Sequence, residues 1–148
     1  MAVTQIIPYL FFNGEGADAV AHYQKALGAE VLDLRRYAEM SADENAAEGE
    51  APDPDRVMHA MLSIDGQLLM ISDTPKDQDH SRSPQVELNL NFDDLADQQR
   101  RFEALAEGGK ITAALHDAFW GDRFGAVTDR FGICWICLLY TSPSPRDS

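Results

Sequence analysis

The sequence has few cysteines, few basic residues and no long apolar run. Its 12 Lys and Arg residues stand against 25 Asp and Glu, and the formal net charge of −13 repels phosphate backbones and anionic lipid surfaces. No stretch approaches the roughly 20 apolar residues of a membrane span, and the first ten residues show no basic segment before an apolar run. We therefore expect a cytoplasmic protein that binds neither nucleic acid nor membrane.

The loops that hold nucleotide-like cofactors are also missing. We find no Gly-rich turn between a strand and a helix, no phosphate-binding loop and no nucleophile elbow. The two cysteines, Cys134 and Cys137, have the C-x-x-C spacing of redox and metal motifs. They lie in the apolar run 133–139, which is typical of a strand, where side chains three residues apart point to opposite faces. We therefore expect neither a shared metal nor a disulfide between them.

What is present is the composition of an ordinary globular domain. Apolar residues make up 45% and charged residues 25% of the 148 residues, which is enough chain for one sizeable core.

The first half of the sequence predicts an apolar strand over 3–12, at an edge or with a bulge because of Pro8. Apolar residues at spacings of three and four predict a helix over 16–27, ended by Gly28. Further strands are predicted over 29–37, 57–64 and 67–72, the last two joined by a hairpin at Asp65-Gly66.

The second half repeats this order after a predicted linker at 73–84. A strand is predicted over 86–92, a helix over about 94–107 and strands over 110–115 and 133–139. The buried stripe of this helix is expected to consist of Leu95, Phe102 and Leu105. Phe12, Tyr23 and Val31 correspond to Phe92, Phe102 and Ile111 at an offset near 80 residues. This correspondence indicates an internal duplication.

The repeat predicts an α+β domain. Each half, 3–73 and 85–137, would form a curled mixed sheet with its helix on the outer face and a pocket on the concave face. The single domain then spans 1–137. Residues 138–148 are expected to be a disordered or artefactual tail, because their Ser and Pro content does not suit a sheet.

Five segments carry a resemblance to a known family. They are Tyr9-Leu10-Phe11-Phe12-Asn13-Gly14, Val57-Met58-His59-Ala60, Leu69-Met70-Ile71-Ser72-Asp73, Phe119-Trp120-Gly121-Asp122-Arg123-Phe124-Gly125 and Thr128-Asp129-Arg130-Phe131-Gly132. In this order, over about residues 4–136, they resemble the PhnB-like branch of the vicinal oxygen chelate superfamily. That superfamily includes glyoxalases, extradiol dioxygenases and antibiotic-resistance proteins. The resemblance implies paired βαβββ modules, a homodimer and a small-molecule ligand.

The resemblance also implies, for metal-using relatives, a divalent ion held by His and Glu on inward-facing strands. The implied positions carry Ile7 or Tyr9, Met70 or Ser72, Glu87 and Ile136 in this chain. Glu87 alone among them is a convincing ligand, and a divalent site needs several N or O donors. A divalent metal is therefore not favoured, and the cofactor stays unknown. A substitute set would combine His59 and Glu87 with Asp73 or His116.

Two residues are candidates for catalysis. His59 lies on the strand face opposite Ala60 and Leu62, where it serves either as a base or as a hydrogen-bonded structural histidine. Glu87 begins a polar strand face with Asn89 and Asn91. That face is either the solvent side of a sheet or a pocket wall with Glu87 as base and the asparagines as donors.

Aromatic and charged residues complete the predicted pocket. Tyr9, Phe11, Phe119 and Trp120 are expected to shape an aromatic wall, and Arg123 to hold an anionic or carbonyl-bearing substrate. Asp117 is a further pocket candidate, or pairs with Arg123. Asp129 is expected to brace a turn. The histidines His22 and His80 are expected on the surface.

Three functions follow from these residues. The first is an enzyme that polarises vicinal oxygens, as a lyase, isomerase or dioxygenase. The second is a non-catalytic protein that binds or sequesters a small molecule, which needs only a shaped aromatic pocket. The third is a demethylubiquinone methyltransferase-like activity, placed last because no loop for a nucleotide-like cofactor is found.

Overall fold

A computed structural model describes residues 3–39, 53–75, 86–118 and 121–140. The chain divides into two compact units, Met1–His80 and Ser81–Ser148, and each is described by itself. Within the described ranges, no helix is long and apolar enough to cross a membrane.

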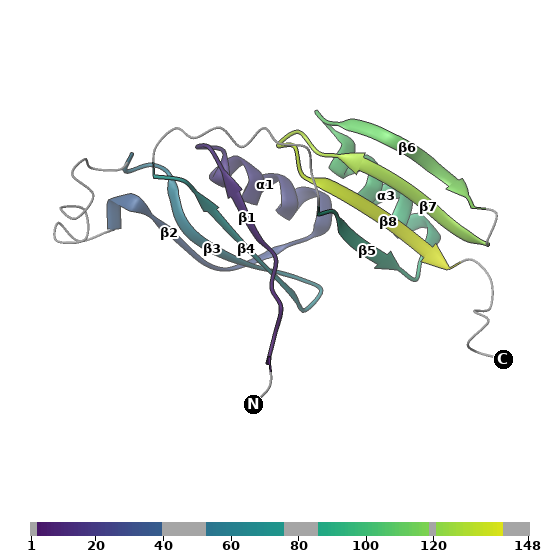
Figure 1. Cartoon of the computed structure of the whole chain (residues 1–148), viewed down its shortest axis with the longest axis horizontal. Coiled ribbons are helices and arrows are strands. Elements are labelled where there is room, and N and C mark those ends of the chain that lie inside the picture. The colour runs from purple at the N-terminus through teal and green to yellow at the C-terminus, as the bar shows by residue number, and fades with distance from the viewer. Residues whose placement is uncertain (1–2, 40–52, 76–85, 119–120, 141–148) are drawn as a thin grey trace. The chain divides into compact units, whose positions relative to one another are not determined.

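The first unit is a four-stranded mixed sheet with one helix. Its elements are β1 (Tyr9–Phe12), α1 (Gly16–Leu27), β2 (Glu30–Arg36), the short 3-10 helix η1 (Tyr37–Glu39), β3 (Val57–Ile64) and β4 (Gln67–Asp73). The strand order is β1-β4-β3-β2, with β1 parallel to β4 and the other pairs antiparallel. The helix α1 covers one face of this sheet (Figure 1). β1 follows Pro8 directly and lies at the sheet edge, which confirms the edge prediction.

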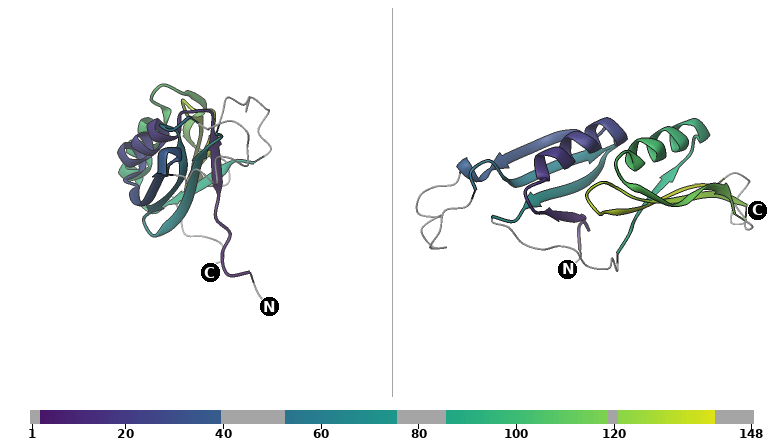
Figure 2. Two further views of the ribbon diagram at one scale, coloured as in Figure 1. Left: turned by 90° about the vertical axis from the view of Figure 1, so that its left-hand side faces the viewer. Right: turned by 90° about the horizontal axis from the view of Figure 1, so that it is seen from above.

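The second unit has the same topology. Its elements are β5 (Leu88–Phe92), α3 (Leu95–Ala106), β6 (Lys110–Asp117), β7 (Asp122–Thr128) and β8 (Cys134–Tyr140). The strand order is β5-β8-β7-β6, again with only the first pair parallel. Within this unit α3 lies over one face of the sheet, as α1 does in the other (Figure 2). The α+β class, the paired βαβββ modules and the mixed sheets are confirmed, and each sheet is open.

Local turn chemistry explains several element ends. Gly28 ends α1 with φ 68°, a left-handed conformation that costs glycine little. Asp65 and Gly66 both have positive φ, at 50° and 88°, as the tight hairpin between β3 and β4 requires. Asp94 caps α3 by accepting a hydrogen bond from the Asp97 amide at 2.8 Å. All three ends lie where the sequence predicted them.

The cores confirm most of the predicted stripes. Tyr23 and Leu27 of α1 are fully buried, as are Phe102 and Leu105 of α3. Leu95, however, is 52% exposed, because it is the first residue of α3 and the buried positions begin one turn later, at Gln98. His22 is buried as well, so its prediction as a surface residue was wrong. It falls within a broad buried stripe of α1.

Several predicted boundaries need correction. The first strand is short, since residues 3–8 precede β1 without strand pairing, and β5 begins at Leu88 instead of residue 86. β7 was given no residue range, although the paired βαβββ modules imply a strand in this part of the second half. Asp73 belongs to β4 and is 1% exposed, so it is no linker residue. Val57 is fully buried and does not share the exposure of His59, because the pairing of β2 with β3 shifts register between these two residues.

The predicted tail boundary is also wrong. β8 continues to Tyr140, since Leu138 and Leu139 are apolar and pair with Asn91 and Phe92 of β5. The remaining residues, 141–148, lie outside the described ranges, as does His80.

Candidate functional site

In the first unit, one sheet face is covered by α1 (Figure 1) and the other carries three of the predicted site residues, Tyr9, Phe11 and His59. Alternation along the strands separates the two sets. Leu69 and Ile71 of β4 are buried on the α1 side, whereas Met70 between them is half-buried. The residues on the face away from α1 are Tyr9, Phe11, His59, Met61 and Met70, and we call this set the aromatic face. The register of the three strands supports it, since Tyr9 pairs with Met70 and Met70 with Met61.

The aromatic face brings Tyr9, Phe11 and His59 into contact. The rings of Tyr9 and Phe11 stack with centroids 4.7 Å apart and an interplanar angle of 16°. The Tyr9 hydroxyl lies 3.2 Å from Nδ1 of His59, and the two rings meet edge to face at 6.0 Å. Tyr9 is 39% and Phe11 51% exposed, which is high for large aromatic side chains. Two predicted wall residues and the predicted base are therefore neighbours.

Which atom donates in the Tyr9–His59 bond depends on the imidazole tautomer. If Nδ1 is the acceptor, the proton of the neutral ring is on Nε2. If Nδ1 carries the proton, the Tyr9 oxygen accepts it and Nε2 has a free lone pair. Either arrangement fixes the ring orientation of His59.

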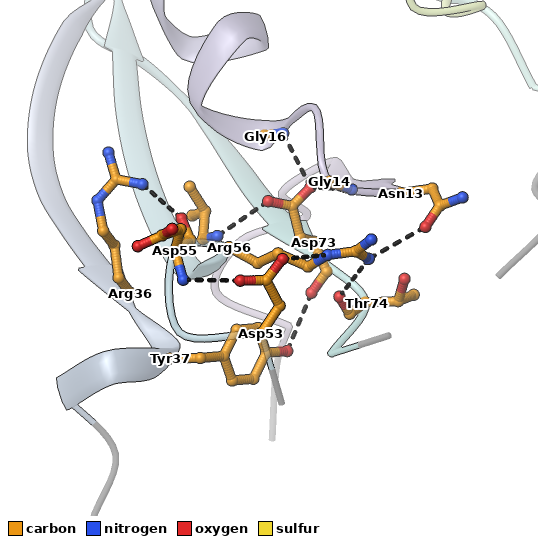
Figure 3. A network of polar contacts seen from close by, with 11 residues as sticks. Asn13, Gly14, Gly16, Arg36, Tyr37, Asp53, Asp55, Arg56, Asp73 and Thr74 are labelled. Carbon is orange, nitrogen blue, oxygen red and sulfur yellow. Dashed lines mark hydrogen bonds and ion pairs between the residues drawn. The ribbon is translucent and has the colours of Figure 1, made fainter. Parts of the chain in front are cut away.

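Asp73, a predicted metal candidate, is instead the centre of a buried hydrogen-bond network (Figure 3). Its Oδ1 accepts hydrogen bonds from the amides of Gly14 and Gly16 at 2.9 and 2.8 Å, and its Oδ2 accepts one from Val57 at 2.9 Å. α1 has no side-chain cap of its own, so the carboxylate from β4 satisfies an amide of its first turn and complements the helix dipole. These contacts give Asp73 a structural role.

Three neighbours complete the network around Asp73. The Tyr37 hydroxyl donates to the Asp73 carbonyl at 2.9 Å, and burial raises the pKa of Tyr37 above its usual 10. Ser72 donates to the carbonyl of Met58 at 2.9 Å, so its hydroxyl is engaged with the backbone. Arg56 donates to the Asn13 side chain and to the Thr74 carbonyl, which joins the end of β1 to the end of β4 (Figure 3).

In the second unit, the sheet face away from α3 carries Asn89, Asn91, Phe124 and His116. Asn89 donates to Asn91 at 2.8 Å, and both are exposed. His116 lies opposite Phe124 with ring centroids 5.8 Å apart, and its Nδ1 is 2.7 Å from the Ala114 carbonyl. Glu87 is exposed and precedes β5. The predicted asparagine row thus exists, with Glu87 next to it in sequence.

Arg123 lies on the opposite face of the second sheet. It pairs with Leu139, which is buried on the α3 side, and its Nε is buried without a hydrogen bond in the described part of the chain. Asp117 is exposed and lies opposite Arg123 on β6, yet no ion pair joins the two. The structure therefore separates Arg123 from the asparagine row. Phe119 and Trp120 lie outside the described residues.

Asp129 and Gln98 hold the second unit together. Asp129 accepts hydrogen bonds from the amides of Phe131 and Ile133 and from the Trp135 indole at 2.9–3.0 Å, which is the predicted bracing of the turn. Gln98 is fully buried and donates to the carbonyls of Arg123 and Cys137. Its role was missed. Its spacing could have indicated burial, because residues 98, 102 and 105 lie on one face of the helix.

The ligands of a divalent metal do not converge in the described ranges, where no three His, Cys, Asp or Glu side chains gather. Of the predicted set, His59 is hydrogen-bonded to Tyr9, and the Asp73 carboxylate accepts hydrogen bonds from three backbone amides. His116 and Glu87 belong to the other unit. Among the described residues, this set therefore forms no His-and-Glu centre within either unit.

Comparison with known proteins yields consistent matches. The Glyoxalase/Bleomycin resistance protein/Dioxygenase superfamily profile matches residues 5–136. Protein YjdN of Escherichia coli (strain K12) is 37% identical over 134 residues, which cover 87% of this chain and 90% of that protein. The crystal structure of protein PA1353 from Pseudomonas aeruginosa is 32% identical, with a TM-score of 0.78 and coverage of 95% and 100% of the two chains.

A more distant structure has the same fold. It is described as a putative 3-demethylubiquinone-9 3-methyltransferase, PhnB protein, from Bacillus cereus. Its TM-score is 0.77 at 23% identity, and the match covers 92% of this chain and 99% of that one. At this identity the similarity concerns the fold alone.

Proposed function

Because the chain belongs to the Glyoxalase/Bleomycin resistance protein/Dioxygenase superfamily, we propose that it binds a small molecule on the aromatic face, with His59 as the acid–base group. The observation that carries this proposal is the hydrogen bond between the Tyr9 hydroxyl and Nδ1 of His59 at 3.2 Å, beside the exposed ring of Phe11. An exposed aromatic pair next to an oriented imidazole supplies both contact area and a proton carrier.

The aromatic face suits a small ligand with a flat apolar part and at least one oxygen. Stacking on Phe11 and Tyr9 would use the ring faces, and the half-buried Met61 and Met70 would contact the remaining apolar surface. His59 would then accept a proton from, or donate one to, the oxygen-bearing carbon framework. Lyase and isomerase reactions of carbonyl compounds require such a group.

A second candidate function is binding without turnover. It is favoured by the absence of converging divalent-metal ligands among the described residues, because a sequestering protein needs only a shaped surface. A methyltransferase activity has no supporting observation here, and the Bacillus cereus structure contributes only its fold.

The two candidates differ in the outcome of one experiment. The chain is screened by NMR against small aromatic and vicinal-dioxygen compounds, such as catechols and α-keto acids, and binders are then assayed for product. Phe11→Ala should weaken binding at least tenfold, whereas Ile111→Ala, a matched change at a 46% exposed residue of the second unit, should not. Equal loss in both variants would contradict the placement of the ligand.

Turnover then separates the enzyme from the binder. If His59 is the acid–base group, His59→Gln lowers kcat by about 10²–10⁴-fold with KM little changed. If the protein only binds, no product forms with the wild-type chain and His59→Gln shifts Kd alone. His116→Gln is the control for loss of an exposed histidine, and an equal effect of the two variants would remove the assignment of His59.

A further inference from the structure

Two methionines and a histidine lie on the aromatic face. Met61 of β3 and Met70 of β4 are directly opposite each other in the antiparallel register, and both are half-buried. Directly opposed residues of such a pair have Cβ atoms about 4.5–5.5 Å apart. His59 lies two residues before Met61 on the same strand and is half-buried too. Three side chains with sulfur or nitrogen donors therefore share one partly exposed patch.

The donor types of this patch are selective. Thioether sulfur is a soft ligand that selects Cu(I), and imidazole nitrogen also binds copper. Hard divalent ions prefer carboxylate oxygens, and in the described ranges no group of three acidic, His or Cys side chains offers them. A patch of two thioethers and one imidazole therefore discriminates in favour of a soft monovalent ion.

The hydrogen bond to Tyr9 prepares His59 for this role. Metal-binding histidines usually engage their second ring nitrogen with an oxygen partner, which fixes the tautomer and the ring orientation. Here Nδ1 is engaged with the Tyr9 hydroxyl at 3.2 Å, while Nε2 makes no hydrogen bond within the part of the chain that the structure describes. A proton on Nδ1 would leave the Nε2 lone pair available.

We propose that His59, Met61 and Met70 form a three-coordinate binding site for Cu(I), with Tyr9 as the residue that orients His59. An apolar lining would also account for two methionines, since methionine packs well beside aromatic rings. It would not account for an imidazole held through one nitrogen beside them. The proposal does not rest on the proposed ligand or reaction, because it is tested with the metal alone.

The test uses the full chain with Cys134→Ser, because a half-buried thiol would compete for Cu(I). Serine keeps a hydrogen-bonding group at this position, where the Cys134 sulfur lies 3.5 Å from the Thr128 hydroxyl. Ag(I), a redox-stable soft ion, is titrated into protein labelled at the methionine methyl groups, and Cu(I) affinity is measured by competition with bathocuproine disulfonate. We expect one equivalent to shift the methyl signals of Met61 and Met70.

Variants locate the site. Met61→Leu and Met70→Leu conserve side-chain volume, so the fold should be retained. Each should weaken Cu(I) binding at least tenfold, as should His59→Gln, whereas His116→Gln should change it less than twofold. The proposal is overturned if Ag(I) leaves the Met61 and Met70 methyl signals unmoved, if binding disappears with Cys134→Ser, or if His116→Gln matches His59→Gln. Before metal is added, the remaining methyl signals of each variant should match those of the parent protein. A match shows that a loss of Cu(I) affinity does not come from a loss of fold.

Discussion

Single buried polar residues decide the local structure of both units. Asp73 brings together the start of α1, the start of β3 and the end of β4 through three backbone amides. Gly16 belongs to this arrangement, because a Cβ there would lie 2.8 Å from the Asp73 carboxylate. The sequence alone suggested a linker or a metal ligand for Asp73. Its real role depends on segments 16 to 59 residues away, and no local pattern encodes that distance.

Loss of the Asp73 charge should be costly. Asp73→Asn replaces one acceptor oxygen by an amide donor that faces a backbone N–H, so we expect the free energy of unfolding to fall by about 2–4 kcal/mol. Urea denaturation followed by circular dichroism measures this. Asp117→Asn, at an exposed position, should change stability by no more than about 0.5 kcal/mol. Similar losses in the two variants would contradict the role of Asp73.

The Cys137 thiol gives a second expectation at this scale. Burial raises its pKa from 9.0 to about 12, so the folded protein holds this proton where the unfolded chain releases it. The stabilisation is complete below pH 9 and is lost as the pH rises from about 9 toward 12. Between pH 7.5 and 9.5 the free energy of unfolding should fall by roughly 1 kcal/mol from this group. Cys137→Ala should show a shallower pH dependence, and equal slopes in both proteins would contradict the assignment.

At the scale of elements, the sequence was most informative where patterns are local. The helix 16–27, the strand 57–64 and the hairpin at Asp65-Gly66 were predicted with their observed positions, because periodicity and turn residues are adjacent in sequence. β7 was given no residue range, since its alternation is interrupted by Gly125. A side chain there would lie 2.7 Å from Leu115 and 2.9 Å from Phe102, so the glycine admits the close packing of helix on sheet.

The register of the two sheets shows which residues occupy equivalent positions in the two units. Tyr9 and Phe11 on β1 occupy the positions of Asn89 and Asn91 on β5, and His59 occupies that of Phe124. The face away from the helix is therefore aromatic in the first unit and carries amides in the second. The sequence predicted both rows, but it did not predict that Tyr9 reaches across β4 to His59, because that contact spans 50 residues.

The Gln98 side chain links α3 to β7 and β8 by hydrogen bonds. Its amide donates to the Arg123 carbonyl at 3.1 Å and to the Cys137 carbonyl at 3.3 Å. Gln98→Ala removes both bonds and leaves a cavity, so we expect a loss of about 2–4 kcal/mol in the free energy of unfolding.

The neighbouring residue supplies the control for Gln98. Gln99 is exposed and its side-chain amide donates to the Glu103 carboxylate at 3.4 Å, so Gln99→Ala should cost less than about 0.5 kcal/mol. Chemical denaturation of the two variants side by side makes the comparison. A loss for Gln98→Ala no larger than that for Gln99→Ala would show that the buried amide contributes nothing.

At the scale of the whole molecule, the chain consists of two units of the same topology and has a strongly acidic composition. The net charge of −13 favours solubility and a cationic or neutral ligand over a polyanion.

The assembly state is an expectation from the family. We predict a homodimer, with a mass in light scattering of about twice the 16.4 kDa of the chain. The mass should hold over a tenfold dilution in the micromolar range. A mass of one chain at every concentration would contradict the dimer.

The Asp73 network has a consequence for biosynthesis. The α1 amide that Asp73 accepts from lies 57 residues earlier in the chain. A ribosome therefore synthesises the whole of α1, β2 and β3 before it adds the carboxylate that completes the start of α1. Nascent chains that stop short of β4 would leave the first turn of α1 without its partner. The first module thus becomes complete only once its last strand has been translated.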